Sequence, residues 1–333
     1  MRNLPRVVTI GGGTGNYVSL MGLKKYDLKL TAVVNMFDDG GSTGVLRDEL
    51  GVLPPGDVRQ CLVALSESSL TLRKLFNYRF EEGGLKGHTF GNIFLSALEK
   101  ETGSFKKAIK EIGKILRIKG DVLPITYTKS TLNAKLTDGT LIKGQHHVDV
   151  LEEKITRAPI SQIYLKPKAK INADVKKALF SADFIIIGPG DLYTSILPNI
   201  LVNDASNFIK KSRAKKIFIM NLMTKYGQTS GWGAKKHLEV LESYLGKGII
   251  DLIILNTGNP HKDVLSWYAK YHEEPIKDDF GKKEAIRIIR EDLLKDVLVR
   301  KSTADILRRS IIRHDSEKLA SEIMKIIKSG HFA

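Results

Sequence analysis

The sequence is poor in cysteine and in long apolar runs, and both shortages limit what the protein can be. It contains one cysteine, Cys61, among 333 residues. A single cysteine excludes an intramolecular disulfide and a zinc site built from cysteines. No apolar run reaches the roughly 18 residues of a membrane-spanning helix, and strand-like sequence from Val7 leaves no room for a signal peptide. We therefore expect a cytoplasmic protein without membrane insertion.

Several common catalytic motifs are also missing. The sequence has no His-Glu-x-x-His element and no recognisable cysteine–histidine dyad. The Gly-Lys-Ser/Thr ending of an ATPase phosphate loop is absent as well. These absences argue against zinc catalysis, nucleophilic hydrolysis and a standard ATPase site.

Acidic residues are fewer than basic ones, 37 against 53, so the formal net charge is +16. Excess positive charge favours anionic partners such as nucleotides, sugar phosphates or nucleic acid. A lysine-rich, solvated surface would give the same composition. Because the lysines are scattered and no nucleic-acid-binding motif is present, we expect no nucleic-acid partner.

Short apolar runs alternate with amphipathic stretches along most of the chain. Residues 6–10 predict a buried strand, residues 17–25 a helix and residues 30–35 a second strand. The same rhythm returns in the second half, where residues 184–187 predict another buried strand and residues 316–328 a final helix. This order indicates an α/β fold with a Rossmann-like, doubly wound and mainly parallel sheet.

The middle of the chain has a different character, which suggests three parts. Residues 1–119 form the first part of a nucleotide-binding core, and residues 171–333 form its second part with the C-terminal helix. Residues 120–170 predict a small antiparallel β insertion, in which Asp138 and Gly139 are typical of a hairpin turn.

A glycine-rich loop follows the first predicted strand and consists of Gly11, Gly12, Gly13, Thr14 and Gly15. Glycines between a strand and a helix let free N–H groups and the helix dipole face an anion. The third glycine of the dinucleotide fingerprint is replaced by an asparagine, so the loop does not predict a standard NAD site. We interpret it as a phosphate site, with a tight structural turn as the alternative.

Acidic residues follow the second predicted strand. Asp38 and Asp39 should lie at the carboxyl edge of the sheet, beside the glycine loop. They could bind a ribose, hold Mg²⁺ against a diphosphate or act as a base, and a solvated turn is the alternative. Asp57 has the spacing of a helix N-cap.

Other predicted strand ends carry polar or glycine-rich loops too. Because the carboxyl ends of parallel strands meet at one edge, these loops should converge on one crevice. That convergence is a stronger indication of a binding site than any single motif. The candidate residues in these loops are Asn92, Gly190, Tyr193, Thr194, Ser195, Asn221 and Thr224.

Taken together, these loops resemble the YvcK-type gluconeogenesis factors, from the same superfamily as the CofD-type 2-phospho-L-lactate transferases. The resemblance extends from about residue 6 to the Arg313-His314-Asp315 segment. The ordered segments that carry it are Gly11 to Gly15, Asp38 to Gly44, Pro54 to Arg59, Gly188 to Ser195 and Asn221 to Thr224.

The resemblance implies a Rossmann-like core with a nucleotide crevice. It implies a cytoplasmic protein that binds a UDP-sugar, UDP-N-acetylglucosamine or UDP-glucose, and supports cell shape and cell-wall maintenance during gluconeogenic growth. By position in the family it also implies ligand contacts for Tyr268 and Arg313. An aromatic ring can stack on a base, and a guanidinium can bridge a diphosphate.

Four positions depart from the family pattern. Asn16 and Tyr17 replace Leu-Ser, Asp191 replaces a serine, and Gln228 replaces a glutamate. Asp191 adds negative charge beside a proposed phosphate, so ligand preference could differ and a bound metal would be favoured.

Two functions therefore remain open. The first is a regulatory protein that binds a nucleotide sugar without turnover. The second is a Mg²⁺-dependent transferase of the 2-phospho-L-lactate transferase type, with Asp38 or Asp39 as metal ligands and a phospholactyl acceptor and a deazaflavin as requirements. The sequence leaves the oligomeric state open, a homo-oligomer included.

Overall fold

The computed structural model describes residues 4–149, 157–281, 284–296, 298, 304–305 and 310–329. Its centre is a seven-stranded sheet in which every neighbouring pair of strands is parallel. The strands in spatial order are β10 (Arg287–Glu291), β9 (Leu252–Asn256), β8 (Lys215–Ile219), β7 (Phe184–Ile187), β1 (Arg6–Gly11), β2 (Lys29–Val34) and β3 (Asp121–Pro124).

The predicted doubly wound α/β fold is confirmed. Starting at β1, the chain builds the sheet outward through β2 and β3, then returns to place β7 on the other side of β1. The strand order therefore reverses between β1 and β7, which is the switch point where such folds bind ligands. The central strands are apolar almost throughout because both faces of a parallel sheet are covered.

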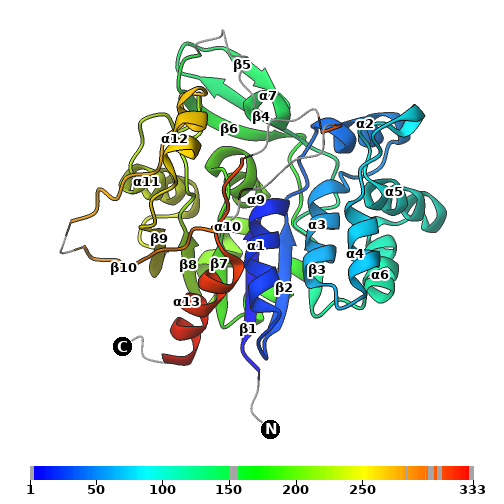
Figure 1. The fold of residues 1–333 in the computed structure, drawn as a ribbon, viewed down its shortest axis with the longest axis horizontal. Helices are drawn as coiled ribbons and strands as arrows, with labels where there is room; N and C mark the ends of the chain where they lie inside the picture. The colour runs from blue at the N-terminus through cyan, green and yellow to red at the C-terminus, as the bar shows by residue number, and fades with distance from the viewer. Residues whose placement is uncertain are drawn as a thin grey trace.

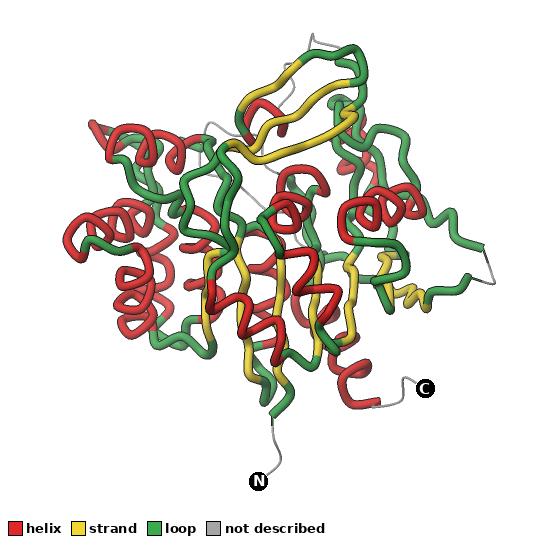
Figure 2. The backbone as a smooth tube through the Cα atoms, turned by 180° about the vertical axis from the view of Figure 1, so that it is seen from behind, coloured by secondary structure: helices red, strands yellow, loops and turns green. Residues whose placement is uncertain are grey.

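Helices cover both faces of the sheet (Figures 1 and 2). They are α1 (Gly13–Leu23), α2 (Gly41–Leu50), α3 (Gly56–Leu65), α4 (Leu70–Asn77), α5 (Phe90–Thr102), α6 (Phe105–Leu116), α8 (Ala173–Ser181), α9 (Leu197–Leu201), α10 (Ala205–Lys211), α11 (Ala234–Leu245), α12 (Lys262–Ala269) and α13 (Ser316–Ser329). Within the described residues, no helix combines the length and the apolarity needed to cross a bilayer.

Helix α13 brings the end of the chain back against α1, as Figure 1 shows. The contact is close because Gly22 has no side chain: a Cβ at this position would overlap the carbonyl oxygen of Ser316. A glycine inside α1 costs helix propensity, and here it allows two backbones to approach. The start of α13 is thereby fixed beside the carboxyl end of α1.

The antiparallel insertion exists, but the predicted start at residue 120 is wrong. Its sheet has the order β5-β4-β6, with β4 (Thr131–Leu136), β5 (Leu141–Lys143) and β6 (Ile160–Lys166), and it carries α7 (Gln145–Asp149). The hairpin at Asp138 and Gly139 is confirmed, with a left-handed φ of 91° at the glycine. Residues 121–124 instead form β3, which pairs in parallel with β2. A four-residue apolar strand does not reveal from its pattern which sheet it joins.

Helix α2 and strand β10 have no counterpart in the prediction. Helix α2 starts at Gly41, inside a glycine-rich stretch that looks like a loop because its helix propensity is low. Strand β10 is half exposed and charged at both ends, so it lacks the apolar run that marks the central strands.

Candidate functional site

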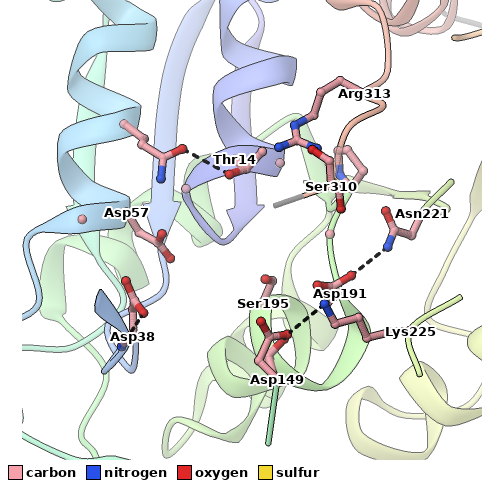
Figure 3. Close-up of a pocket in the computed structure, with 18 of the residues that line it drawn as sticks. Thr14, Asp38, Asp57, Asp149, Asp191, Ser195, Asn221, Lys225, Ser310 and Arg313 are labelled. Carbon is pink, nitrogen blue, oxygen red and sulfur yellow. Dashed lines mark hydrogen bonds and ion pairs between the residues drawn. The ribbon is translucent and has the colours of Figure 1, made fainter. Parts of the chain in front are cut away.

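A crevice lies at the carboxyl ends of the strands around the switch point (Figure 3). The loops after β1, β2, β7 and β8 line it, together with α7 and the segment before α13. The structure brings together most of the predicted site residues here, namely Gly13, Thr14, Gly15, Asp38, Asn92, Gly190, Thr194, Ser195, Asn221, Thr224, Tyr268 and Arg313.

The two glycine-rich loops meet at the base of the crevice. A Cβ on Gly15 would overlap the carbonyl oxygen of Pro189, and a Cβ on Gly12 would lie 3.0 Å from the Ser195 hydroxyl. Helix α1 begins after Gly12 without a side-chain cap on its first amides. Free amides and the positive end of a helix dipole favour an anion at this point.

Three of the predicted loop residues do not line the crevice. Gly11 is the last residue of β1 and pairs with Val34, and Gly12 is the N-cap residue of α1. Tyr193 is a core residue, 4% exposed, whose ring packs edge-on against Trp232. Burial raises the pKa of the Tyr193 hydroxyl. Tyr193 therefore belongs to the Gly188 to Ser195 motif because its ring packs in the core beneath that loop.

The two adjacent aspartates have different roles. Asp38 lines the crevice, and one of its carboxylate oxygens accepts the Gly40 amide at 3.1 Å. Asp39 does not line it: its carboxylate accepts the amides of Gln145 and His146 at 3.1 and 2.6 Å. Asp39 thus anchors the start of α7, and the prediction that it faces a ligand or metal is not supported.

Asp57 is not the N-cap of α3. The helix starts one residue earlier at Gly56, with Pro55 in the cap position and no side-chain cap bond. The Asp57 carboxylate instead points to the glycine loop, within 2.6 Å of where a Cβ on Gly13 would lie. Figure 3 shows Asp38 and Asp57 on the same side of the crevice. Two carboxylates beside the proposed phosphate position match the ligands that Mg²⁺ takes from proteins.

A hydrogen-bond chain runs along the same wall. Arg59 is 8% exposed and donates to the side-chain oxygen of Asn92 at 2.9 Å. The Asn92 amide donates to the Ser42 hydroxyl at 3.1 Å, and this hydroxyl lies 3.1 Å from Nδ1 of His88. Asn92 therefore orients its neighbours as well as lining the crevice.

Residues 40–44 have Gly-x-Ser-x-Gly spacing, a match that the sequence analysis overlooked. The serine of that motif in hydrolases sits on a sharp strand-to-helix turn. Here Ser42 is the second residue of α2, and its hydroxyl oxygen already accepts a hydrogen bond. We assign it a positioning role in the chain of side chains on this wall.

The opposite wall carries three carboxylates, of which Glu273 is buried and Asp149 and Asp191 are half-buried. Sequence reasoning missed all of them except Asp191. The Asn221 amide donates to Asp191 at 3.0 Å. Burial raises the pKa of Asp191, and the ammonium of Lys225 opposes that rise. Lys225 Nζ lies 3.9 Å from both Asp149 and Glu273. Asp149 comes from the insertion and Glu273 from the turn after α12, so no local motif connects them.

Tyr268 contributes its hydroxyl rather than its ring. The side chain is 1% exposed and packs edge-on against Trp267 at 4.9 Å. Its hydroxyl oxygen accepts the amides of Ile311 and Ile312 at 3.1 and 3.4 Å. A ring this buried has no face open to a nucleotide base, so the predicted stacking is not supported. Tyr268 instead positions the backbone of residues 311 and 312.

Arg313 follows directly in the segment that Tyr268 holds. Its guanidinium donates to the carbonyls of Ser310 and Ile312, both at 2.8 Å. Figure 3 shows the side chain extending from this segment toward Thr14 at the amino end of α1. The cation thus lies opposite the proposed phosphate position.

His314 is a buried, neutral histidine beside Arg313. Burial, together with the neighbouring Arg313 guanidinium, lowers its pKa to about 4, although a hydrogen bond with the backbone of Met220 opposes this fall. Its Nε2 atom has no hydrogen-bond partner among the described residues. The imidazole lines the crevice as an uncharged group at neutral pH.

The parallel sheet, its switch point and the two glycine-rich loops define an α/β protein of the Rossmann-like class with a polar crevice at the carboxyl edge. A family model described as 2-phospho-L-lactate transferase CofD matches residues 7–294. The gluconeogenesis factor of Halalkalibacterium halodurans is 40% identical, over 96% of this chain and 95% of that protein. The gluconeogenesis factor of Listeria monocytogenes is 38% identical, over 97% of this chain and 96% of that protein.

A solved structure shows the same architecture. A member of the UPF0052 family from Bacillus halodurans superposes with a TM-score of 0.88 at 37% identity, covering 97% of this chain and 100% of that chain. The chain belongs to the CofD family and, within it, to the YvcK-type gluconeogenesis factors.

Tyr268→Phe should loosen the segment before α13. Loss of the hydroxyl leaves two amides without their acceptor, so we expect the free energy of unfolding to fall by about 1–2 kcal/mol. Amide hydrogen exchange of Ile311 and Ile312 should accelerate. Tyr244→Phe is the matched control, because Tyr244 accepts one amide, from Ile163, away from the crevice. Unchanged exchange at 311 and 312 would show that the hydroxyl does not hold the segment.

His314 should make the protein less stable in mild acid. The folded-state pKa of about 4 lies below the ordinary value, so between pH 6.5 and 4 the unfolded chain binds a proton that the folded chain does not. As the pH falls through that window, protonation of His314 in the unfolded chain should lower the free energy of unfolding by about 1.4 kcal/mol per pH unit. Urea unfolding from pH 7.5 to 5 measures this slope.

His314→Asn should flatten the slope, and His147→Asn, at an exposed position, should leave it unchanged. An identical pH dependence in the wild type and His314→Asn would contradict the assignment.

Proposed function

We propose that the protein binds a UDP-sugar, UDP-N-acetylglucosamine or UDP-glucose, in the crevice and acts as a regulator rather than by turnover. The observation that carries this proposal is the convergence of two glycine-rich loops at the switch point, with Arg313 lining the same crevice. Ligands of doubly wound folds bind at this point of the sheet.

The diphosphate is the part of the ligand that the glycine-rich wall suits best. The uncapped first turn of α1 offers backbone amides, and the hydroxyls of Thr14 and Ser195 lie beside them. Arg313 would bridge the phosphate oxygens from the opposite side, since a guanidinium matches phosphate geometry. Together these groups supply donors and positive charge for an anion.

The sugar would lie toward Asp149, Asp191 and Glu273. Carboxylates accept hydrogen bonds from sugar hydroxyls, and Lys225 offsets part of their negative charge. Three carboxylates against one ammonium would repel a sugar that carries its own carboxylate. This wall therefore favours an uncharged hexose or N-acetylhexosamine over a uronic acid.

The regulatory role rests on the relatives. Proteins named gluconeogenesis factor match this chain over nearly its whole length. We propose the same role here, in support of cell shape and the cell wall during growth on gluconeogenic carbon sources, from the cytoplasm.

Titration calorimetry with UDP-N-acetylglucosamine tests the binding. We expect saturable heat, weaker heat with UDP-glucuronic acid, and a roughly tenfold or greater loss of affinity in Arg313→Ala, because a charge-assisted bond to phosphate is lost. Arg213→Ala, at an exposed position outside the crevice, is the matched control. No heat with any UDP-sugar would refute the proposal, as would equal affinity in Arg313→Ala.

A Mg²⁺-dependent transferase is the second candidate, favoured by the family match and by the carboxylates of Asp38 and Asp57 in the crevice. Mg²⁺ is commonly held by one or two carboxylates together with substrate phosphates. These two residues would hold it, and the ion would neutralise phosphate charge. Among the described residues, no group of three or more His, Cys, Asp or Glu side chains forms a metal site without phosphates.

Asp38→Asn distinguishes this candidate from the first. If the protein is a transferase, Mg²⁺-dependent transfer from a phospholactyl donor to a deazaflavin should fall about 100-fold or more, since a metal ligand is lost. Asp48→Asn, on an exposed side chain of α2, should keep full activity. Absence of transfer in the wild type with Mg²⁺ present would eliminate the candidate.

A further inference from the structure

The ligand crevice does not account for the positive charge of the protein. Its described lining residues include four Arg or Lys side chains and five Asp or Glu side chains. A second hollow has a very different balance, with seven Arg or Lys side chains against two aspartates. The seven are Arg6, Lys29, Lys106, Lys110, Lys114, Arg117 and Lys177.

This hollow, the α6–α8 groove, has a volume of about 830 Å³ and runs between helices α6 and α8. It reaches β1, β2 and β3 at their first residues, Arg6, Lys29 and Asp121. The ligand crevice lies at the other end of the same strands. A partner in the groove would therefore leave the crevice open.

The walls of the groove are two helix faces. On α6 the cationic residues Lys106, Lys110 and Lys114 recur every fourth position, so they share one side of the helix. On α8 the lining residues Asp174, Lys177, Ala178 and Ser181 have the three- and four-residue spacing of one helix side.

The floor of the groove is apolar. Ile118, Leu123, Tyr127 and Ala178 line it and are each half-buried. Gly113 also faces the groove and presents only backbone. Parallel sheets are normally covered by helices on both faces, and apolar floors with polar rims mark interaction sites.

Part of the cationic rim has no internal counter-charge. Lys106 pairs with Asp174, and Lys114 pairs with Glu111 on its own helix. Within the described ranges, Lys29, Lys110 and Lys177 form no ion pair. All three are exposed. They are available to carboxylates on another molecule.

We propose that the α6–α8 groove binds an acidic amphipathic helix of a partner protein. The helix would lie between α6 and α8 and complete the layer over β1 to β3, with its apolar stripe on the floor. Its Asp and Glu side chains would face Lys110 and Lys177. Helix-in-groove docking of this kind uses apolar anchors for affinity and complementary charge for selection.

Fluorescence anisotropy with labelled synthetic peptides of about 18 residues, long enough to form a helix in water, tests the proposal. The first peptide is helical with Leu on one face and Glu on the other. The second has the same composition without the apolar stripe, and the third carries Lys in place of Glu. Only the first should bind saturably.

Charge reversal locates the contact. The double variant Lys110→Glu/Lys177→Glu should weaken binding of the first peptide about tenfold or more, because both rim cations become repulsive. Lys107→Glu/Lys211→Glu makes the same change in net charge at exposed positions outside the groove. It should weaken binding less than about twofold. Ala178→Trp fills the groove without changing charge and should also abolish binding.

Circular dichroism and thermal unfolding check that each variant is folded, and a variant that unfolds is replaced by Lys110→Gln/Lys177→Gln. Equal weakening by the two double variants would overturn the proposal, since it would indicate non-specific attraction. Equal binding of the first two peptides would overturn it too, as would binding of neither. Binding to phosphatidylglycerol vesicles that Lys110→Glu/Lys177→Glu abolishes, without peptide binding, would assign the groove to a membrane surface instead.

Discussion

The backbone contact between the two glycine-rich loops is the constraint on which the crevice depends. The loop after β1 and the loop after β7 leave neighbouring strands in the same direction, and Gly15 meets Pro189 with no room for a side chain. This contact sets the distance between the first turn of α1 and the hydroxyls that follow Gly190. An anion at the helix terminus is then within reach of groups from both halves of the sheet. A side chain at Gly15 would separate the loops before it touched any ligand.

The second support of the crevice comes from the far end of the chain. Close packing of α13 on Gly22 fixes the start of that helix, and the Tyr268 hydroxyl fixes the two residues before Arg313. Arg313 is thus held from both sides. Helices α1 and α13 are far apart in the sequence, so this part of the site depends on contacts between opposite ends of the chain. The buried tyrosine thus orients a cation of the crevice through backbone amides.

The sequence predicted the sheet well where strands are continuous apolar runs bounded by glycine, as at β1 and β7. The prediction failed where the structure depends on contacts between residues far apart in the sequence. The place of β3 depends on which sheet it joins, and the role of Asp39 depends on α7 of the insertion, which follows about a hundred residues later. Asp149 and Glu273 were missed for the same reason. Asn16 was recognised as a departure from the fingerprint, but only the structure explains it: its amide donates to the carbonyls of Gly11 and Val33, tying β1 to β2.

Net charge gave the least reliable guide to the site. The composition, at +16, favoured an anionic ligand, and a nucleotide diphosphate is one. Yet carboxylates outnumber cations among the described residues that line the crevice. A few oriented donors in a partly buried site act more strongly on a phosphate than many solvated lysines, because exposed charges are screened within about 10 Å. The surface lysines can therefore serve a different contact, the proposed one in the α6–α8 groove. There the cations are concentrated beside an apolar floor at the amino ends of the strands, which distinguishes the groove from a uniformly basic surface.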